Sequence, residues 1–173
     1  MKKGFLILAS IITLGLISCS NKSKNTEDEN ISYIKEDDKE INIAMDKAKE
    51  TFDQFEKAFI ENQKTNRYTN FVVKEGFPTK DGSKEHMWVS ELTYDGNNFF
   101  GIVSNEPLYD TKVQLGDTIT IDKNLISDWM YTDTSSNLTY GAYTMRVFVD
   151  RMSDDEKAAF LMENDFTFAP LSE

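Results

Sequence analysis

The chain has 173 residues and a formal net charge of −11, because 30 Asp and Glu residues outnumber 19 Lys and Arg residues. This charge argues against a nucleic-acid-binding protein, since phosphate binding requires clustered basic side chains. With 39% apolar and 12% aromatic residues, the chain can bury a core, and its length fits one folded domain.

The first nineteen residues have the pattern of an export signal. Lys2 and Lys3 precede an apolar run that is too short for a transmembrane helix, which takes roughly 20 apolar residues, whereas a secretory segment needs about 7 to 15. The run ends in Leu16-Ile17-Ser18-Cys19, which resembles the lipobox of bacterial lipoproteins. The resemblance implies cleavage before Cys19 and diacylglycerol on its sulfur. The alternatives are an ordinary cleaved signal followed by a free cysteine, or an uncleaved anchor.

Charge bears on how such a protein would be held at a membrane. Loss of the leader would remove Lys2 and Lys3 and take the formal charge from −11 to −13. Anionic headgroups would repel this surface, so the acyl chains on Cys19 would supply the membrane binding. The sequence therefore predicts a lipid-anchored membrane protein of the bacterial cell envelope, on the periplasmic face. Surface export is the alternative, because of the acidic cluster at 27–29.

The next segment, residues 19–39, is predicted to be the lipidated cysteine and a disordered acidic tether. Polar and charged residues dominate it, and its few apolar residues, Ile31, Tyr33 and Ile34, bury too little surface to offset the entropy of ordering. With residues 1–18 as the signal peptide, this leaves 40–165 as a single domain and 166–173 as a C-terminal tail.

The domain is predicted to open with one amphipathic helix from about Ile41 to Asn62. Apolar residues recur there at intervals of three or four, which places them on one face: Ile41, Met45, Ala48, Phe52, Phe55 and Phe59. We expect this face to pack against a sheet.

Short apolar runs separated by turn residues follow, as is typical of antiparallel strands. Asp81-Gly82 and Asp95-Gly96 provide the positive φ angles that tight hairpins need. The pattern predicts a meander of about five strands: Tyr68 to Lys74, Glu85 to Tyr94, Phe99 to Ser104, Thr118 to Asp122, and Gly141 to Val149.

Ser153, followed three residues later by Glu156, forms a capping-box pattern that predicts the start of a short C-terminal helix. Helices at both ends of a strand-rich region indicate an α+β domain. Its sheet is expected to be mostly antiparallel, with about five strands and the N-terminal helix packed on it.

Several segments in this order resemble the YegJ-like bacterial family, a domain of unknown function. The resemblance covers roughly Ile41 to Val149 and implies a shared fold, but it implies no catalytic or binding residue. The segments that carry it are Ala44 to Phe55, Glu85 to Val89, Gly116 to Thr120, Ile126 to Tyr131, and Gly141 to Arg146.

Two of these segments provide a candidate binding or structural cluster: His86, Trp88, Asp128, Trp129 and Tyr131. If Asp128 came near His86, the carboxylate could orient the imidazole for general-base chemistry. In the structural interpretation, the indole rings are core anchors, and His86 and Asp128 are hydrogen-bonding partners within the fold.

Residue counts argue against several catalytic and cofactor classes. The chain has one histidine and one cysteine, which are too few for a zinc site built from histidine and cysteine ligands. The single cysteine is Cys19, the predicted lipid site, so no other cysteine could act as a nucleophile. No glycine-rich phosphate loop or Gly-x-Ser-x-Gly motif is present. We expect neither a metal nor a cofactor. A glycosidase-type carboxylate pair is defined by its separation in space, so the sequence leaves it open.

Two functional hypotheses follow. The first is a non-catalytic binding or protective module that contacts another envelope protein or ligand through a sheet face or edge. The second is an envelope hydrolase that uses His86 and Asp128.

Overall fold

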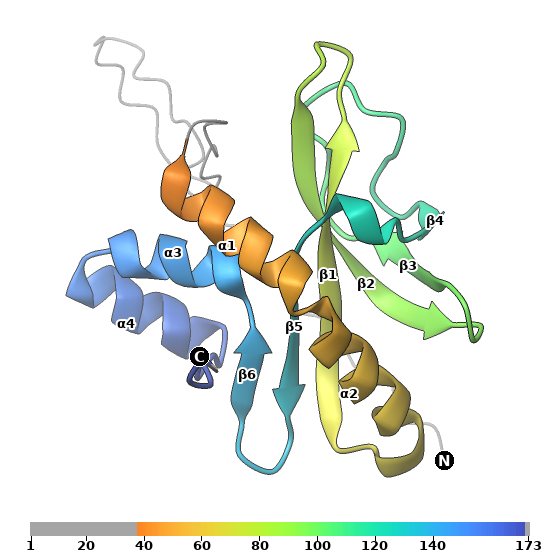
Figure 1. Ribbon diagram of the computed structural model, residues 1–173. Helices are drawn as coiled ribbons and strands as arrows, with labels where there is room; N and C mark the ends of the chain where they lie inside the picture. The colour runs from red at the N-terminus through yellow and green to blue at the C-terminus, as the bar shows by residue number, and fades with distance from the viewer. Residues whose placement is uncertain (1–37, 172–173) are drawn as a thin grey trace, which may run out of the picture. The chain divides into compact units, whose positions relative to one another are not determined.

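The computed structural model describes residues 38–171. Within this range the chain is an α+β protein with one six-stranded antiparallel sheet in the order β4-β3-β2-β1-β5-β6. Two helices precede the sheet along the chain and two follow it (Figure 1). The predicted leader, the lipid site at Cys19 and nearly all of the predicted tether lie outside the described residues.

The N-terminal helical region consists of two helices, α1 (Lys39–Glu50) and α2 (Phe52–Thr65), rather than the single helix predicted. Thr51 separates them with φ −105° and ψ 6°. Its hydroxyl donates to the carbonyl oxygen of Lys47 at 2.7 Å and lies 2.9 Å from the hydroxyl of Tyr143. A threonine that bonds back to the preceding turn often bends a helix, and Tyr143 fixes this one from outside.

The strands are β1 (Tyr68–Pro78), β2 (Lys84–Tyr94), β3 (Phe99–Val103), β4 (Thr118–Thr120), β5 (Ile126–Asp133) and β6 (Leu138–Gly141). The predicted count of five is therefore wrong, and β5 and β6 were missed. In β5, seven of the eight residues are buried, so the strand lacks the alternation of apolar and polar residues that reveals a half-buried strand.

The predicted strand from Gly141 to Val149 is wrong, because this segment is mostly helix α3 (Tyr143–Arg151). Gly141 at φ 73° and Ala142 at φ 56° turn the chain out of β6. Gly141 also lies against Trp129, where a Cβ would come within 2.2 Å of the Trp129 carbonyl oxygen. The β-branched residues of the segment favour a strand, but this turn and the capping of α3 described below override that preference.

Helix α4 (Asp154–Glu163) begins at the predicted capping box. The backbone N–H of Ser153 donates to the Glu156 carboxylate at 2.9 Å, and the Glu156 N–H is 3.5 Å from the Ser153 hydroxyl. Two helices thus follow the sheet, where one short helix was expected.

The hydrophobic core lies between the sheet and helices α1 and α2 (Figure 1). Phe55 is fully buried and has its ring centroid 5.9 Å from that of Trp129 and 5.5 Å from that of Phe71. Burying an aromatic side chain of this kind stabilises the fold by about 2 kcal/mol.

At the surface, Lys123 of the turn before β5 forms an ion pair with Glu56 of α2 at 2.6 Å.

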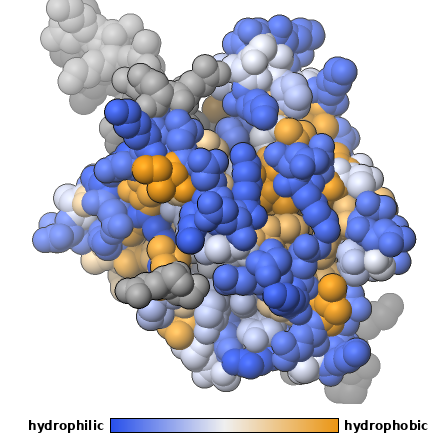
Figure 2. All heavy atoms as spheres, viewed as in Figure 1, coloured by the Kyte–Doolittle hydropathy of each residue, from blue (hydrophilic) through white to orange (hydrophobic). Residues whose placement is uncertain are grey.

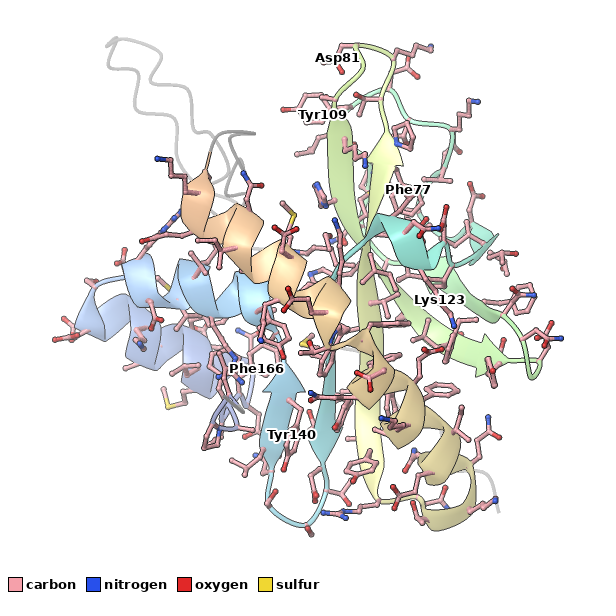
Figure 3. The ribbon with its side chains drawn as sticks, in the orientation of Figure 1. Phe77, Asp81, Tyr109, Lys123, Tyr140 and Phe166 are labelled. Carbon is pink, nitrogen blue, oxygen red and sulfur yellow. The ribbon has the colours of Figure 1, made fainter. Side chains whose placement is uncertain are left out.

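The long connection between β3 and β4 is held against the sheet by a buried carboxylate. Glu85 in β2 accepts hydrogen bonds from the backbone N–H groups of Leu108, at 2.7 Å, and Tyr109, at 3.0 Å. Figure 3 shows Tyr109 beside the β1–β2 hairpin that carries Phe77 and Asp81. Glu85, which the sequence places only at the start of a strand, therefore fixes this connection.

Candidate functional site

The sheet register separates the five predicted cluster residues into two groups. Lys74 in β1 pairs with both Trp88 in β2 and Asp128 in β5, and Gly76 pairs with His86. Since paired residues of antiparallel strands share a face, His86, Trp88 and Asp128 lie on one face. Trp129 and Tyr131 belong to the core, on the face that α1 and α2 cover. We call the side with His86 the second face.

Trp129 and Tyr131 act as core anchors. Trp129 is 1% exposed, and its indole N–H donates to the carbonyl oxygen of Ala48 in α1 at 2.9 Å. The two rings stack with their centroids 5.9 Å apart, and burial raises the pKa of Tyr131 to about 12. These contacts support the structural interpretation for both residues.

Asp128 holds the start of α3. Its carboxylate is fully buried and accepts from the backbone N–H of Tyr143 at 2.9 Å and of Thr144 at 2.8 Å, and from the Thr144 hydroxyl at 2.6 Å. A carboxylate at a helix N-terminus satisfies free N–H groups and interacts favourably with the helix dipole. Burial raises the pKa of Asp128, against the opposing charge of Lys74 and the Thr144 hydrogen bonds.

His86 is paired with a serine rather than with a carboxylate. Its Nδ1 lies 2.8 Å from Oγ of Ser127, whose hydroxyl donates to the carbonyl oxygen of Lys74. Because a serine hydroxyl has one proton, this geometry places a proton on Nδ1 of a neutral His86. Burial, with the nearby charge of Lys74, lowers the pKa of His86 to about 4. The imidazole lies over Gly76, where a Cβ would come 3.0 Å from its Cε1.

Lys74 was not predicted from the sequence, yet it connects the residues of the second face. It is 9% exposed, and its ammonium lies 4.7 Å from the ring centroid of Trp88 and 3.4 Å from the Thr144 hydroxyl oxygen. Burial lowers the pKa of Lys74, while the charge of Asp128 opposes this. No local signal could have identified it, because its neighbours come from β2, β5 and α3.

The structure does not bring Asp128 to the imidazole of His86. Asp128 accepts from the backbone N–H groups of Trp129, Tyr143 and Thr144 and from the Thr144 hydroxyl. His86 instead pairs with Ser127, which is 1% exposed and donates its proton to a backbone carbonyl. Within residues 38–171, no group of three or more His, Cys, Asp and Glu side chains is placed to hold a metal ion. In the same range, no helix has the length and apolar character needed to cross a membrane.

The second face also carries a row of apolar side chains that sequence reasoning did not single out. Val72 pairs with Met130, and Ile102 pairs with Ser90, so these residues point away from the core. Each member of the row is half-buried, and none belongs to the core cluster. We call this set the apolar row: Val72, Trp88, Phe100, Ile102 and Met130. It spans four neighbouring strands, from β3 to β5.

The fold and the site define an α+β protein with an antiparallel sheet, whose first face packs on helices and whose second face carries the apolar row. The chain belongs to the bacterial family described as "Uncharacterized protein conserved in bacteria" (DUF2314), which matches residues 38–168. This match confirms the resemblance to the YegJ-like family.

Two curated relatives match part of the chain. An "Uncharacterized protein YegJ" of Escherichia coli (strain K12) is 39% identical over 87 residues, which are 50% of this chain and 55% of the relative. A "Putative ankyrin repeat protein" of Neisseria meningitidis serogroup B is 28% identical over 132 residues, 73% of this chain and 51% of the relative. The chain thus spans about half the length of these relatives. No solved structure matches.

Proposed function

We propose that this protein is a non-catalytic binding module, held to the bacterial envelope by lipid on Cys19, that contacts a partner protein through the apolar row. The observation that carries the proposal is the row itself. An antiparallel sheet with one face on the core commonly has a polar, solvated second face. Here five half-buried apolar side chains lie on that face across four neighbouring strands, and apolar side chains grouped on a surface are typical of interaction sites.

The position of Trp88 strengthens this assignment. The buried ammonium of Lys74 lies 4.7 Å from the centre of its ring, and this cation–π contact restricts the indole. A large side chain that is ordered before binding loses little entropy in a complex. Tryptophan is also enriched among the residues that contribute most to binding energy in protein interfaces. Trp88 therefore fits the role of a central anchor.

The comparison with the Neisseria relative supports a role in protein association. That protein is named for ankyrin repeats, and the match covers about half of it. Ankyrin repeats stack into extended surfaces that bind other molecules. A domain found in such a protein is in keeping with a binding function.

Crosslinking in cells tests this proposal. We expect a photoreactive phenylalanine analogue at position 100 to form a protein adduct, and the substitution Trp88→Ala to reduce its yield at least about tenfold, as loss of an anchor residue does. Gel mobility and mass spectrometry measure the adduct, and circular dichroism verifies the fold of the variant.

A photoreactive residue at position 60 is the matched control, because Ile60 is an apolar residue of α2 that is 41% exposed and lies outside the apolar row. Equal adducts from positions 60 and 100, or an adduct at position 100 that Trp88→Ala leaves unchanged, would contradict the proposal.

The lipid anchor is tested separately. We expect labelled palmitate to be incorporated into the wild-type protein and not into Cys19→Ala, because Cys19 is the only cysteine of the chain. A high-salt wash of the membrane fraction distinguishes acyl insertion from electrostatic adsorption, because salt screens electrostatic attraction. We expect the wild-type protein to stay in the membrane fraction after this wash. Label in the Cys19→Ala protein would refute this anchor.

A further inference from the structure

The two edges of the sheet differ in whether the chain's own backbone covers them. At one edge, the C-terminal segment lies against β6: the N–H of Thr139 donates to the carbonyl oxygen of Thr167 at 2.8 Å, and the N–H of Ala169 donates to that of Thr139 at 2.9 Å. At the other edge lies β4, and within residues 38–171 its only neighbouring strand is β3 (Figure 1). An open edge of this kind is a template for another strand.

The pairing of β3 with β4 determines which backbone groups point outward. The N–H of Val103 donates to the carbonyl oxygen of Asp117 at 2.9 Å, and hydrogen-bonded pairs alternate along an antiparallel ladder. Ile119 is therefore bonded to β3, whereas the N–H and C=O groups of Thr118 and Thr120 point away from the sheet. Both threonines are exposed, and among the described residues none pairs with these four groups.

The side chains of Thr118 and Thr120 lie on the second face, beside the apolar row. Thr118 pairs with Ile102 of the row. Thr120 pairs with Phe100, and paired residues share a face. A strand added to β4 would place alternate side chains on this face, about 10 Å, or two strand spacings, from the row. The side that carries α1 and α2 is mainly hydrophilic (Figure 2), so the apolar side chains of such a strand belong on the second face.

Two carboxylates flank this edge. Asp117 directly precedes β4, Asp122 follows it by two residues, and both are exposed. Each accepts hydrogen bonds from N–H groups of its own turn, and within the described range neither forms an ion pair. Asp122 also borders a cavity of about 400 Å³ at the end of β4, whose Lys123 is already paired with Glu56. The uncompensated charge at both ends of the edge is therefore negative.

We infer that β4 accepts an extended, basic segment of a partner protein as an additional strand. This inference rests on the proposed function and names the part of the partner that makes the contact. In strand addition, main-chain hydrogen bonds give affinity and alternate side chains give specificity. Thr118 and Thr120 provide the main-chain groups, the apolar row receives apolar side chains, and the flanking carboxylates select Lys or Arg. A second copy of this chain, with its net charge of −11, would instead bring like charges together.

Crosslinking in cells tests the inference at the edge itself. We expect a photoreactive phenylalanine analogue at position 118 to form an adduct with another protein, and Thr120→Pro to lower its yield about tenfold. Proline removes one outward N–H, and its ring obstructs the incoming strand. Edge strands tolerate proline where the N–H faces solvent, so the pairing with β3 is retained, which circular dichroism verifies. Thr120→Ala is the matched control, because alanine keeps this N–H, and we expect it to leave the yield unchanged.

A second variant removes the charge without altering the backbone. We expect the double substitution Asp117→Asn and Asp122→Asn to lower the yield at position 118 about threefold, because asparagine keeps an acceptor oxygen but has no charge to attract a basic side chain. Asp154→Asn, in the first turn of α4, should leave the yield unchanged. Mass spectrometry should locate the adduct in a segment of the partner that contains Lys or Arg.

Equal yields from Thr120→Pro and Thr120→Ala would overturn the inference. An adduct with another copy of this chain would also overturn it and would assign the edge to self-association. An adduct at position 100 that depends on Trp88, with none at position 118, would overturn the inference and leave the proposed function intact. If neither position formed an adduct, both the inference and the proposed function would be refuted.

Discussion

Asp128→Ala is expected to lower the free energy of unfolding by about 3 kcal/mol, since it leaves several buried donors without an acceptor and removes the cap of α3. The carboxylate is fully buried and accepts from Tyr143 and Thr144. Lys74, also buried, would lose a neighbouring opposite charge, which adds to the cost. Urea denaturation of the full chain measures the effect.

Asp128→Asn separates the cap from the charge. Asparagine keeps one acceptor oxygen but turns its amide toward one of the donors at the start of α3. We therefore expect its free energy of unfolding to lie between those of wild type and Asp128→Ala. Asp154→Asn is the matched control, because Asp154 is an exposed carboxylate in the first turn of α4. If Asp128→Asn and Asp154→Asn unfolded at the same urea concentration as wild type, the capping role would be refuted.

Glu75→Gln and His86→Gln are expected to change the pH dependence of stability in opposite directions. Burial raises the pKa of Glu75 from 4.5 to about 7 and lowers that of His86 from 6.5 to about 4. Glu75 is 4% exposed, and one of its oxygens accepts from the backbone N–H of Asp122 at 3.3 Å.

The signs follow from which state binds the proton more tightly. Folded Glu75 holds its proton more tightly than Glu75 of the unfolded chain does. Its contribution to the stability of the fold is therefore present below pH 4.5 and is lost as the pH rises through 7. Folded His86 resists protonation, so its contribution is present above pH 6.5 and is lost as the pH falls through 4. Between pH 4.5 and 6.5 the two effects oppose each other.

Urea denaturation between pH 4.5 and 7.5 measures both effects as differences from wild type, in which the contributions of other groups, including Asp128, cancel. On going from pH 4.5 to 7.5, we expect the free energy of unfolding of Glu75→Gln to rise by about 2 kcal/mol relative to that of wild type. His86→Gln should gain a similar amount relative to wild type from pH 6.5 to 4.5. A constant difference across the range for either variant would show that the burial of that group does not control its titration.

The α+β class, the capping box at Ser153 and the turns at Gly82 and Gly96 could be predicted because local chemistry produces them. A serine hydroxyl and a glutamate three residues later meet within one helical turn, and glycine adopts positive φ without steric cost. These features depend on residues near each other along the chain. The YegJ-like resemblance was recognised for the same reason, from short segments in a fixed order.

The site could be predicted only in part. His86, Trp88 and Asp128 do lie on one face of the sheet, but nothing in the sequence places Ser127 between the imidazole and the backbone of Lys74. Trp129 and Tyr131 face the core instead, because alternate residues of β5 point to opposite sides. The register between β1 and β5, which joins residues more than fifty positions apart, determines these contacts.

The sequence by itself determined the negative charge, the N-terminal signal pattern at Cys19 and the helical and strand-forming character of most segments, since these depend on composition and local periodicity. Only the tertiary structure decided that the segment after Gly141 is a helix. There the buried Asp128 carboxylate satisfies the N–H groups of residues 143 and 144, and a contact between distant residues outweighs a local preference worth a few tenths of a kcal/mol per residue.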